Sequence, residues 1–178
     1  LNAIYVPLKN ANCMGALYPA QLETYGDYIY GRGSYGVLNS YQGVDNTNST
    51  RIGQMWQLFY QAINNANICL QKIALGDQLT DADKSKYEGE ARFLRRLIYF
   101  TMAKDWGGLI LRNENNMDSV NVGRSSLSDT YNFALADLKF GEANLPNSPR
   151  LLVAPTICAV KSVLTELYLW LQQWQNAR

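Results

Sequence analysis

One predicted helix, over residues 82–106, constrains the fold more than any other part of the sequence. Its apolar residues recur at intervals of four and three, which is the spacing of one helical face. They are Tyr87, Ala91, Leu94, Ile98 and Met102. Thr80 or Asp81 can cap the start of this helix, and Gly107 and Gly108 can take the left-handed backbone that ends it.

The same spacing recurs in three other segments, so the sequence predicts an all-α protein. One predicted helix precedes the 82–106 helix in the chain and runs from about Trp56 to Ile73. Two more follow it, around residues 127–138 and 157–174. No alternating strand pattern of useful length competes with them. We expect an opening helix and a long irregular loop over residues 1–50. A first helix pair should occupy residues 51–112 and a second pair residues 113–178.

Composition excludes several classes of function. The chain has 16 basic and 15 acidic residues, so it lacks the basic excess that a nucleic-acid partner would need. It has no histidine, which excludes histidine-based catalysis and histidine-ligated zinc. The three cysteines, Cys13, Cys69 and Cys158, have no metal-binding spacing and cannot all be paired. We therefore expect no metal and no cofactor.

Two polar residues interrupt the apolar faces of the first helix pair. Asn67 falls within the face formed by Trp56, Tyr60 and Ile63, and Glu90 falls within the apolar arc of the next helix. A buried carboxylate or amide needs a partner. Glu90 could be an acid or base with Asn67 as a positioning group, or both could be struts that tie loop backbone to the helices. The second interpretation is favoured.

A polar flank on the 82–106 helix allows a similar choice. It consists of Glu88, Arg92, Arg95, Arg96 and Tyr99. The arginines could form an anion site, but a flank that is solvated or braces a loop is the more ordinary interpretation. A glycosidase pair is not present here, because Glu88 and Glu90 point to nearly opposite sides of one helix.

These motifs resemble the SusD/RagB family. Its members show Trp, Tyr, Ile and Asn along one helix, followed by Glu-x-Arg-Phe-Leu-Arg and then Trp-Gly-Gly. The matching residues here are Trp56, Tyr60, Ile63, Asn67, Glu90, Arg92, Phe93, Leu94, Arg95, Trp106, Gly107 and Gly108. "LNAIYVPL" resembles the opening helix of the family, and "APTICAVKSVLTELYLWLQQWQNAR" resembles the first helix of a tetratricopeptide unit. The resemblance implies tetratricopeptide-like helical hairpins.

The chain departs from the family pattern in three respects. Arg96 occupies a position where a small residue is commoner. The family's lipid-bearing cysteine and its signal are absent from this chain, and the sequence ends where a further tetratricopeptide helix is expected. We therefore expect residues 1–178 to be the N-terminal part of a single, larger all-α SusD-like domain.

The resemblance also implies a function. Family members are lipid-anchored at the outer membrane on the cell surface, where they bind glycans or other oligomeric nutrients. They deliver these to a SusC-like TonB-dependent transporter and are not enzymes. In this chain the membrane would be reached only through an anchor that the chain does not contain. Two alternatives stay open: a helical repeat module that binds only protein, and a glycosidase on a helical scaffold.

The tyrosine-rich loop is the best candidate for the ligand face. Aromatic rings contact the C–H faces of sugars, while amides, carboxylates and guanidinium groups bond their hydroxyls. The candidates are Tyr25, Asp27, Tyr28, Tyr30, Arg32, Tyr35, Tyr41, Asn46 and Asn48. The opposing interpretation is that most of these tyrosines pack the loop onto the helices. We expect two or three exposed tyrosines in a cluster, and we expect Trp56 and Trp106 to be core residues.

Overall fold

The computed structural model describes residues 1–178 and contains helices and loops but no strands. Its contacts divide the chain into two units, residues 2–62 and residues 63–178 with Leu1. The long helix α4, Asn46–Ala74, runs from the first unit into the second. The expectation of an all-α fold built from helical hairpins is confirmed.

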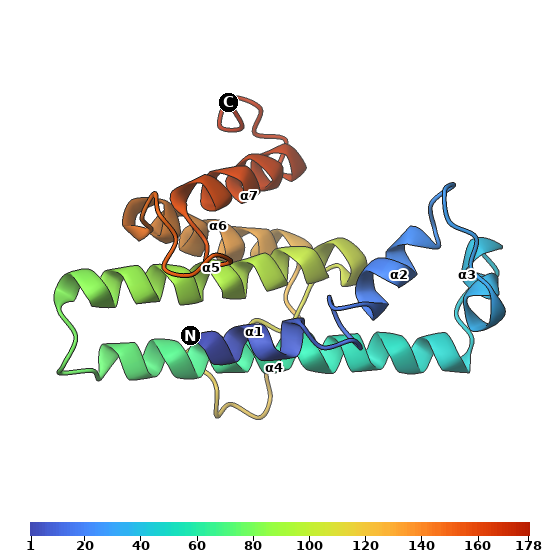
Figure 1. Ribbon diagram of the computed structural model, residues 1–178, viewed down its shortest axis with the longest axis horizontal. Coiled ribbons are helices and arrows are strands. Elements are labelled where there is room, and N and C mark those ends of the chain that lie inside the picture. Colours follow the sequence, from blue (N-terminus) through green and yellow to red (C-terminus); the bar gives the residue numbers. More distant parts are fainter. The chain divides into compact units, whose positions relative to one another are not determined.

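The unit of residues 2–62 is built from short elements around the first half of α4. They are α1 (Asn2–Leu8), α2 (Leu17–Glu23), the 3-10 turn η1 (Gly33–Tyr35) and α3 (Gly36–Asn39). The opening helix is therefore confirmed. Part of the predicted loop is helical, because α2 and α3 lie within it (Figure 1). Ile4, Leu17, Leu38 and Phe59 supply buried apolar side chains.

Helix α4 begins earlier than its apolar pattern predicts. It starts at Asn46, whereas we expected a loop up to residue 50. Asp45 explains the start, because its Oδ1 accepts a bond of 2.8 Å from the backbone N–H of Asn48, and this caps the helix. The polar first turns carry no apolar stripe that could have revealed this extension. Asn46 and Asn48 therefore belong to a helix and not to a loop.

Gly53 offers a test of the helical extension. It is exposed in the interior of α4, and a Cβ built on it would meet nothing within 4 Å. Glycine in an exposed helix interior is less favourable than alanine by about 0.8–1.0 kcal/mol. We expect Gly53→Ala to raise the free energy of unfolding by about this amount in urea titrations. A loss of stability would argue against helix at this position.

The unit of residues 63–178 stacks helices in chain order. The end of α4 is followed by α5 (Asp81–Trp106), α6 (Leu127–Asn144) and α7 (Ile157–Trp170). Helix α6 lies between α5 and α7 (Figure 1). The predicted cap of α5 is present, because Thr80 Oγ1 accepts from the N–H of Asp83. Helix α6 is capped in the same way, since Ser126 Oγ accepts from the N–H of Asp129.

The two glycines at the end of α5 have different roles. Gly107 has φ = 73°, so the expected positive φ is confirmed there. Gly108 has no positive φ, and the expected reason for it is wrong. A Cβ on Gly108 would lie 2.1 Å from the carbonyl oxygen of Ser125. Glycine is needed at 108 because another backbone segment passes against it.

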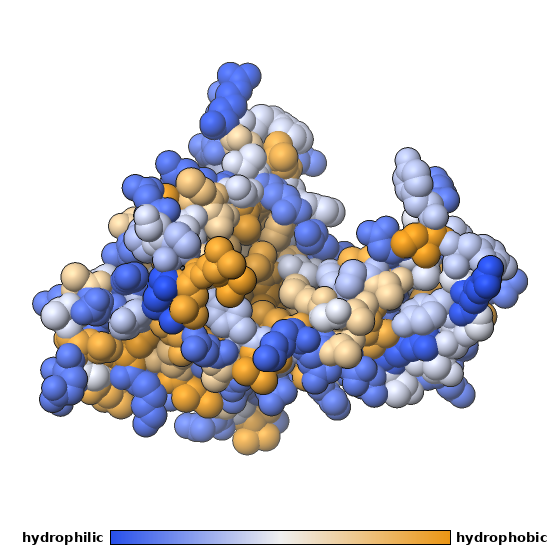
Figure 2. Space-filling model, viewed as in Figure 1, coloured by the Kyte–Doolittle hydropathy of each residue, from blue (hydrophilic) through white to orange (hydrophobic).

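The last helix is shorter than its apolar pattern suggests. It begins at Ile157, so Pro155 precedes its first turn, and it ends at Trp170, before Leu171 and Trp174. Several apolar side chains near it are exposed, and Figure 2 shows hydrophobic surface over the connector between α6 and α7. They are Leu151, Leu152, Val153, Leu169, Trp170 and Trp174.

None of the helices combines the length and hydropathy of a membrane span.

Candidate ligand-binding site

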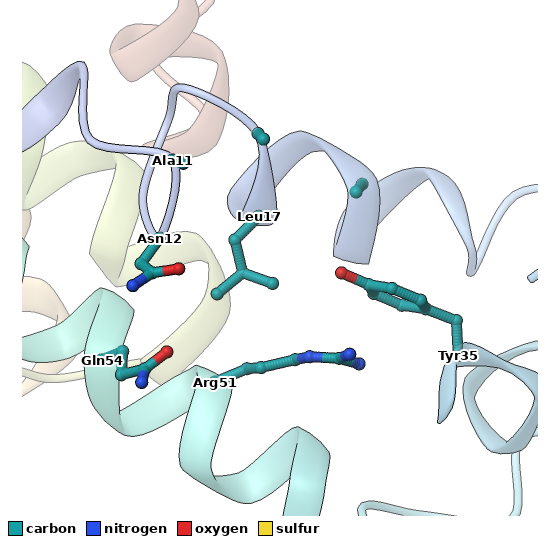
Figure 3. A pocket seen from close by; sticks show the side chains of 8 residues that line it. Ala11, Asn12, Leu17, Tyr35, Arg51 and Gln54 are labelled. Carbon is teal, nitrogen blue, oxygen red and sulfur yellow. The ribbon is translucent and has the colours of Figure 1, made fainter. Parts of the chain in front are cut away.

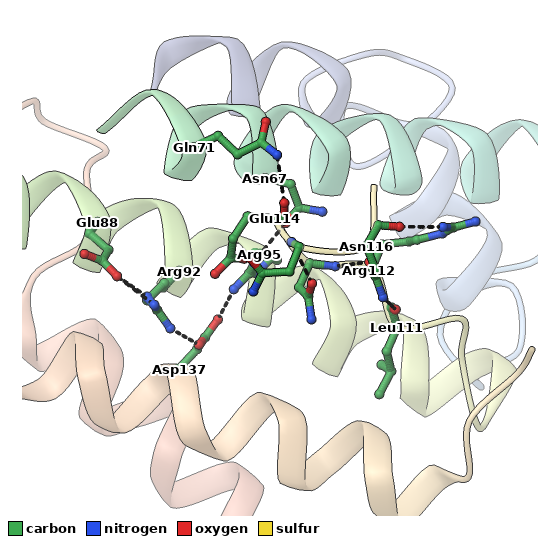
Figure 4. Close-up of polar contacts among 12 residues, drawn as sticks. Asn67, Gln71, Glu88, Arg92, Arg95, Leu111, Arg112, Glu114, Asn116 and Asp137 are labelled. Carbon is green, nitrogen blue, oxygen red and sulfur yellow. Dashed lines mark hydrogen bonds and ion pairs between the residues drawn. The ribbon is translucent and has the colours of Figure 1, made fainter. Parts of the chain in front are cut away.

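The arginine flank of α5 is a buried ion-pair network. Arg95 and Arg96 are each 1% exposed, so the expectation of a solvated flank is wrong for them. Asp137 on α6 bonds all three arginines at 2.7 Å: its Oδ1 accepts from Arg92, and its Oδ2 accepts from Arg95 and Arg96. Figure 4 shows its bonds to Arg92 and Arg95. The sequence pattern did not reveal this partner, because Asp137 is distant in the chain.

This network also braces the connector that follows α5. Arg95 Nη1 donates to Glu114 at 2.5 Å, and the hydroxyl of Tyr99 accepts from the N–H of Arg112 at 2.7 Å. Three guanidinium groups thus meet the carboxylates of Glu88, Asp137 and Glu114. An added anion would find no uncompensated charge. Of the open interpretations, loop bracing is the one that the structure supports.

The electrostatics of the network follow from burial and neighbouring charge. Burial, and secondarily the charge of Arg95, lowers the pKa of Arg96 to about 9 against the opposing pull of Asp137. Burial raises the pKa of Tyr99 to about 12. For Asp137, burial acts to raise the pKa, but Arg96 and Arg95 outweigh it and leave the pKa below its ordinary value. The carboxylate is therefore held ionised.

Glu90 and Asn67, the polar residues within the apolar helix faces, are structural struts. Glu90 is 2% exposed. Arg150, from the connector before α7, donates to it from Nε to Oε2 at 3.0 Å and from Nη2 to Oε1 at 2.8 Å. Asn67 is 1% exposed, and its Oδ1 accepts from Arg95 at 2.6 Å. Its Nδ2 has no hydrogen-bond partner, so the expected satisfaction of this amide is only half met. No group of three or more acidic, cysteine or histidine side chains is placed to hold a metal.

Trp56 and Trp106 are not fully buried. Both are half-buried, and Trp56 pairs with Tyr60 at a ring-centroid distance of 4.9 Å. The backbone carbonyl of Trp106 accepts from Arg124, a basic side chain at the C-terminal end of α5. Neither tryptophan is the fully buried core residue that was expected, although Trp56 packs against Tyr60.

The tyrosine-rich segment presents four exposed rings, which we call the tyrosine surface. They are Tyr25, Tyr28, Tyr30 and Tyr41, with exposed fractions of 38%, 100%, 81% and 70%. The rings of Tyr25 and Tyr41 lie 5.9 Å apart, and the Tyr41 hydroxyl donates to the carbonyl of Tyr25 at 2.6 Å. Asp27, Arg32 and Asn46 are exposed as well. Contiguous exposed apolar groups often mark binding surfaces, and the adjacent rings of Tyr25 and Tyr41 are such a group.

Asn39 holds this segment in place. Its Nδ2 donates to the carbonyls of Thr24 at 2.6 Å and Ile29 at 2.9 Å, and its Oδ1 accepts from the N–H of Gly31. One side chain on α3 therefore fixes both ends of the stretch that carries Tyr25, Tyr28 and Tyr30. Sequence reasoning missed Asn39, because its role depends on a fold-back of 8 to 15 residues that has no local pattern.

Two of the candidate residues serve a different part of this unit. Asn48 is fully buried, and its Nδ2 donates to the Ser34 carbonyl at 2.7 Å and to Asp45 at 2.9 Å. It is a strut, and its assignment to the ligand face is corrected. Tyr35 is half-buried, and its ring lies under the guanidinium of Arg51, 4.0 Å from Cζ to the ring centroid.

Tyr35 and Arg51 form one side of a pocket of about 300 Å³ in the unit of residues 2–62. Figure 3 shows Asn12 and Gln54 on the opposite side and Leu17 between the two sides. Its lining is Ala11, Asn12, Ala16, Leu17, Ala20, Tyr35, Arg51 and Gln54. Of these, the sequence pointed only to Tyr35. Arg51 lies just beyond the tyrosine-rich loop expected up to residue 50. The pocket also depends on the turn between α1 and α2.

Comparison with known proteins identifies the family. A SusD-like family model, described as "Starch-binding associating with outer membrane", matches residues 3–169. The chain belongs to the SusD-like family. This SusD-like chain is 30% identical over 125 residues to a SusD-like protein of Bacteroides ovatus, an alignment that covers 68% of the chain and 23% of that protein. The chain thus spans about a quarter of that relative's length.

Solved structures agree on the fold. A SusD superfamily protein from Bacteroides vulgatus has a TM-score of 0.83 to this SusD-like chain at 24% identity, over 99% of the chain and 39% of that structure. A laminarin-binding SusD-like protein has a TM-score of 0.63 at 25% identity, over 68% of the chain and 27% of that structure. The chain therefore corresponds to part of the proteins that it resembles.

Proposed function

We propose that the protein is a non-catalytic binder of extracellular glycan, or of another oligomeric nutrient, at the outer-membrane surface. It would deliver its ligand to a SusC-like TonB-dependent transporter, and a lipid anchor outside this chain would hold it there. The observation that carries the proposal is the tyrosine surface on a chain of the SusD-like family. The laminarin-binding relative supports glycan as the ligand class.

The chemistry of the tyrosine surface suits capture. Exposed phenol rings offer flat apolar faces to sugar C–H groups, and they lose little conformational entropy on binding because each has only two side-chain torsions. Asn39 and the Tyr41–Tyr25 bond order the backbone beneath the rings before a ligand arrives. Preorganisation of this kind lowers the cost of binding.

Nothing in the surface calls for bond cleavage. Of the two carboxylates in the tyrosine-rich stretch, Asp45 is engaged with Asn48 through its Oδ1. Asp27 is exposed, and no acidic residue lines the pocket beside Tyr35 and Arg51. A glycosidase would need two facing carboxyl groups. Release of products from any glycan would overturn this part of the proposal.

We expect the double variant Tyr28→Ala/Tyr30→Ala to bind glycan about tenfold more weakly, because two stacking faces are lost. Calorimetry of the full-length protein against laminarin, xyloglucan and starch oligosaccharides measures this. Tyr28→Phe keeps the ring and should bind normally. Val120→Ala, at a residue 88% exposed in the other unit, is the control for unrelated surface change.

The same experiment addresses the protein-only alternative. The exposed apolar side chains around α7 would suit a protein partner. Tight binding to the transporter with no affinity for any glycan in the panel would favour that alternative. Unchanged glycan affinity in the double variant would show that the ligand face lies elsewhere.

A further inference from the structure

Arg51 differs from the arginines that form ion pairs. Arg92, Arg95, Arg96 and Arg150 each meet a carboxylate. Arg51 is half-buried, yet its partners are all neutral. Its Nη1 donates to Asn48 Oδ1 at 2.9 Å and its Nη2 to Ser34 Oγ at 2.7 Å.

The network behind Arg51 holds the guanidinium in place without neutralising it. Asp45 bonds Asn48, and Asn48 in turn bonds Arg51, so the carboxylate stands one residue removed from the cation. The ring of Tyr35 covers one face of the guanidinium at 4.0 Å. The bonds to Asn48 and Ser34 use two of the five N–H donors of Arg51, which leaves donors for a further acceptor.

The pocket beside Arg51 has the composition of a site for an anionic group on a small polar molecule. No acidic residue lines it, and Arg51 is its only charged residue. Figure 3 shows the Tyr35 hydroxyl directed toward the side that carries the amides of Asn12 and Gln54. Leu17 supplies an apolar wall between these polar groups.

We propose that this pocket binds the carboxylate of an acidic sugar residue, a uronate, within the bound glycan. This inference rests on the proposed glycan binding and deepens it. The planar guanidinium fork matches the two oxygens of a carboxylate. The phenol and the two amides can bond ring hydroxyls, and Leu17 can contact a C–H face. A volume of about 300 Å³ is at the small end for ligand pockets, which suits one ring of a chain and not an oligomer.

The test compares matched acidic and neutral ligands on the full-length protein. The probes are oligosaccharides of galacturonate, glucuronate, mannuronate and guluronate, each beside its carboxyl-reduced neutral counterpart. We expect at least one acidic form to bind about 10- to 100-fold more tightly than its counterpart. Raising the salt concentration from about 0.05 to 0.5 M should weaken the binding of the acidic form only.

Variants locate the preference. Arg51→Met keeps the apolar stem and should bring the acidic and neutral forms within about twofold of each other, with neutral binding unchanged. Gln54→Leu removes an amide assigned to ring hydroxyls, so it should weaken binding of the acidic and neutral forms alike and leave their ratio unchanged. Lys139→Met removes an exposed cation on α6 and is the control for total charge, with no expected effect.

The outcomes separate this inference from the proposed function. No preference for any acidic form, or a preference that survives Arg51→Met, overturns the uronate assignment while neutral glycan binding stands. Unchanged binding of both forms by Gln54→Leu would also show that the ring does not occupy this pocket. Failure to bind any glycan overturns glycan as the ligand class of the proposed function, and the uronate assignment with it. Preference for a sulfated galactan oligosaccharide over every uronate would replace the carboxylate with a sulfate ester and would also reject the assignment.

Discussion

Replacing Asp137 with asparagine should lower the free energy of unfolding by about 3–5 kcal/mol, the cost of breaking a buried ion pair from one side. Asp137 accepts bonds of 2.7 Å from Arg92, Arg95 and Arg96, and two of those guanidinium groups are 1% exposed. Without the carboxylate, two arginine charges stay buried with much less compensation. Urea unfolding followed by circular dichroism measures the loss.

Glu88→Gln is the matched control for Asp137→Asn. Glu88 also pairs with Arg92, at 2.7 Å, but both side chains are about a quarter exposed. An exposed pair of this kind contributes less than about 1 kcal/mol. Equal losses in the two variants would contradict the view that Asp137 is the centre of the network.

The Asp137 carboxylate should make the free energy of unfolding depend on pH in the acid range. Its pKa in the folded protein lies below the ordinary value of 3.8, because the pull of Arg96 and Arg95 exceeds the effect of burial. A lowered pKa stabilises the fold at pH values above the ordinary pKa, and the contribution is lost as pH falls through the folded pKa. We expect Asp137→Asn to flatten this acid limb of the stability curve.

Gly108→Ala should destabilise the protein at the upper end of the range of about 1–3 kcal/mol seen for overpacking. A Cβ there would lie 2.1 Å from the Ser125 carbonyl oxygen and 3.1 Å from the Leu127 nitrogen, both of which are backbone atoms. No side chain can rotate away, so the connector or the end of α5 must move. Thermal melting and hydrogen exchange over residues 107–127 report the shift.

Gly123→Ala is the control within the same connector. A Cβ at Gly123 would meet nothing within 4 Å, and its φ is not in the positive region. Substitution there should change stability by less than about 0.5 kcal/mol. If both glycine variants melt at the same temperature as the natural protein, the close approach at Gly108 is not rigid.

The helices could be predicted because their signals are local. Apolar spacing located α5 and the start of α6 well, and the side chain of Thr80 caps α5 as its position indicated. Such signals fail where a helix has no apolar stripe. The first turns of α4 are polar, so their helical state depends on a cap by Asp45 that the pattern did not reveal.

The polar residues were harder to interpret, because a sequence shows that a buried charge needs a partner but not which one. Glu90 clearly required a partner, yet Arg150 lies 60 residues away in an irregular connector. Arg95 and Arg96 were expected on a flank that could be solvated, and the packing of α6 buried them. The expectation that a buried charge has a partner of opposite charge was confirmed. Which charges are buried was decided by tertiary contacts.

The amino-acid sequence by itself determined the all-α class, the helix pairs, the family and the tyrosine-rich stretch, since periodicity, caps and composition act over a few neighbouring residues. Only the tertiary structure decided which tyrosines are exposed, that Asn48 is buried, and that Arg51 lines a pocket with Tyr35 and Gln54. The physical reason is that exposure and pocket shape depend on how distant backbone segments fold against one another. Single side chains such as Asn39 hold those segments through bonds that no local pattern encodes.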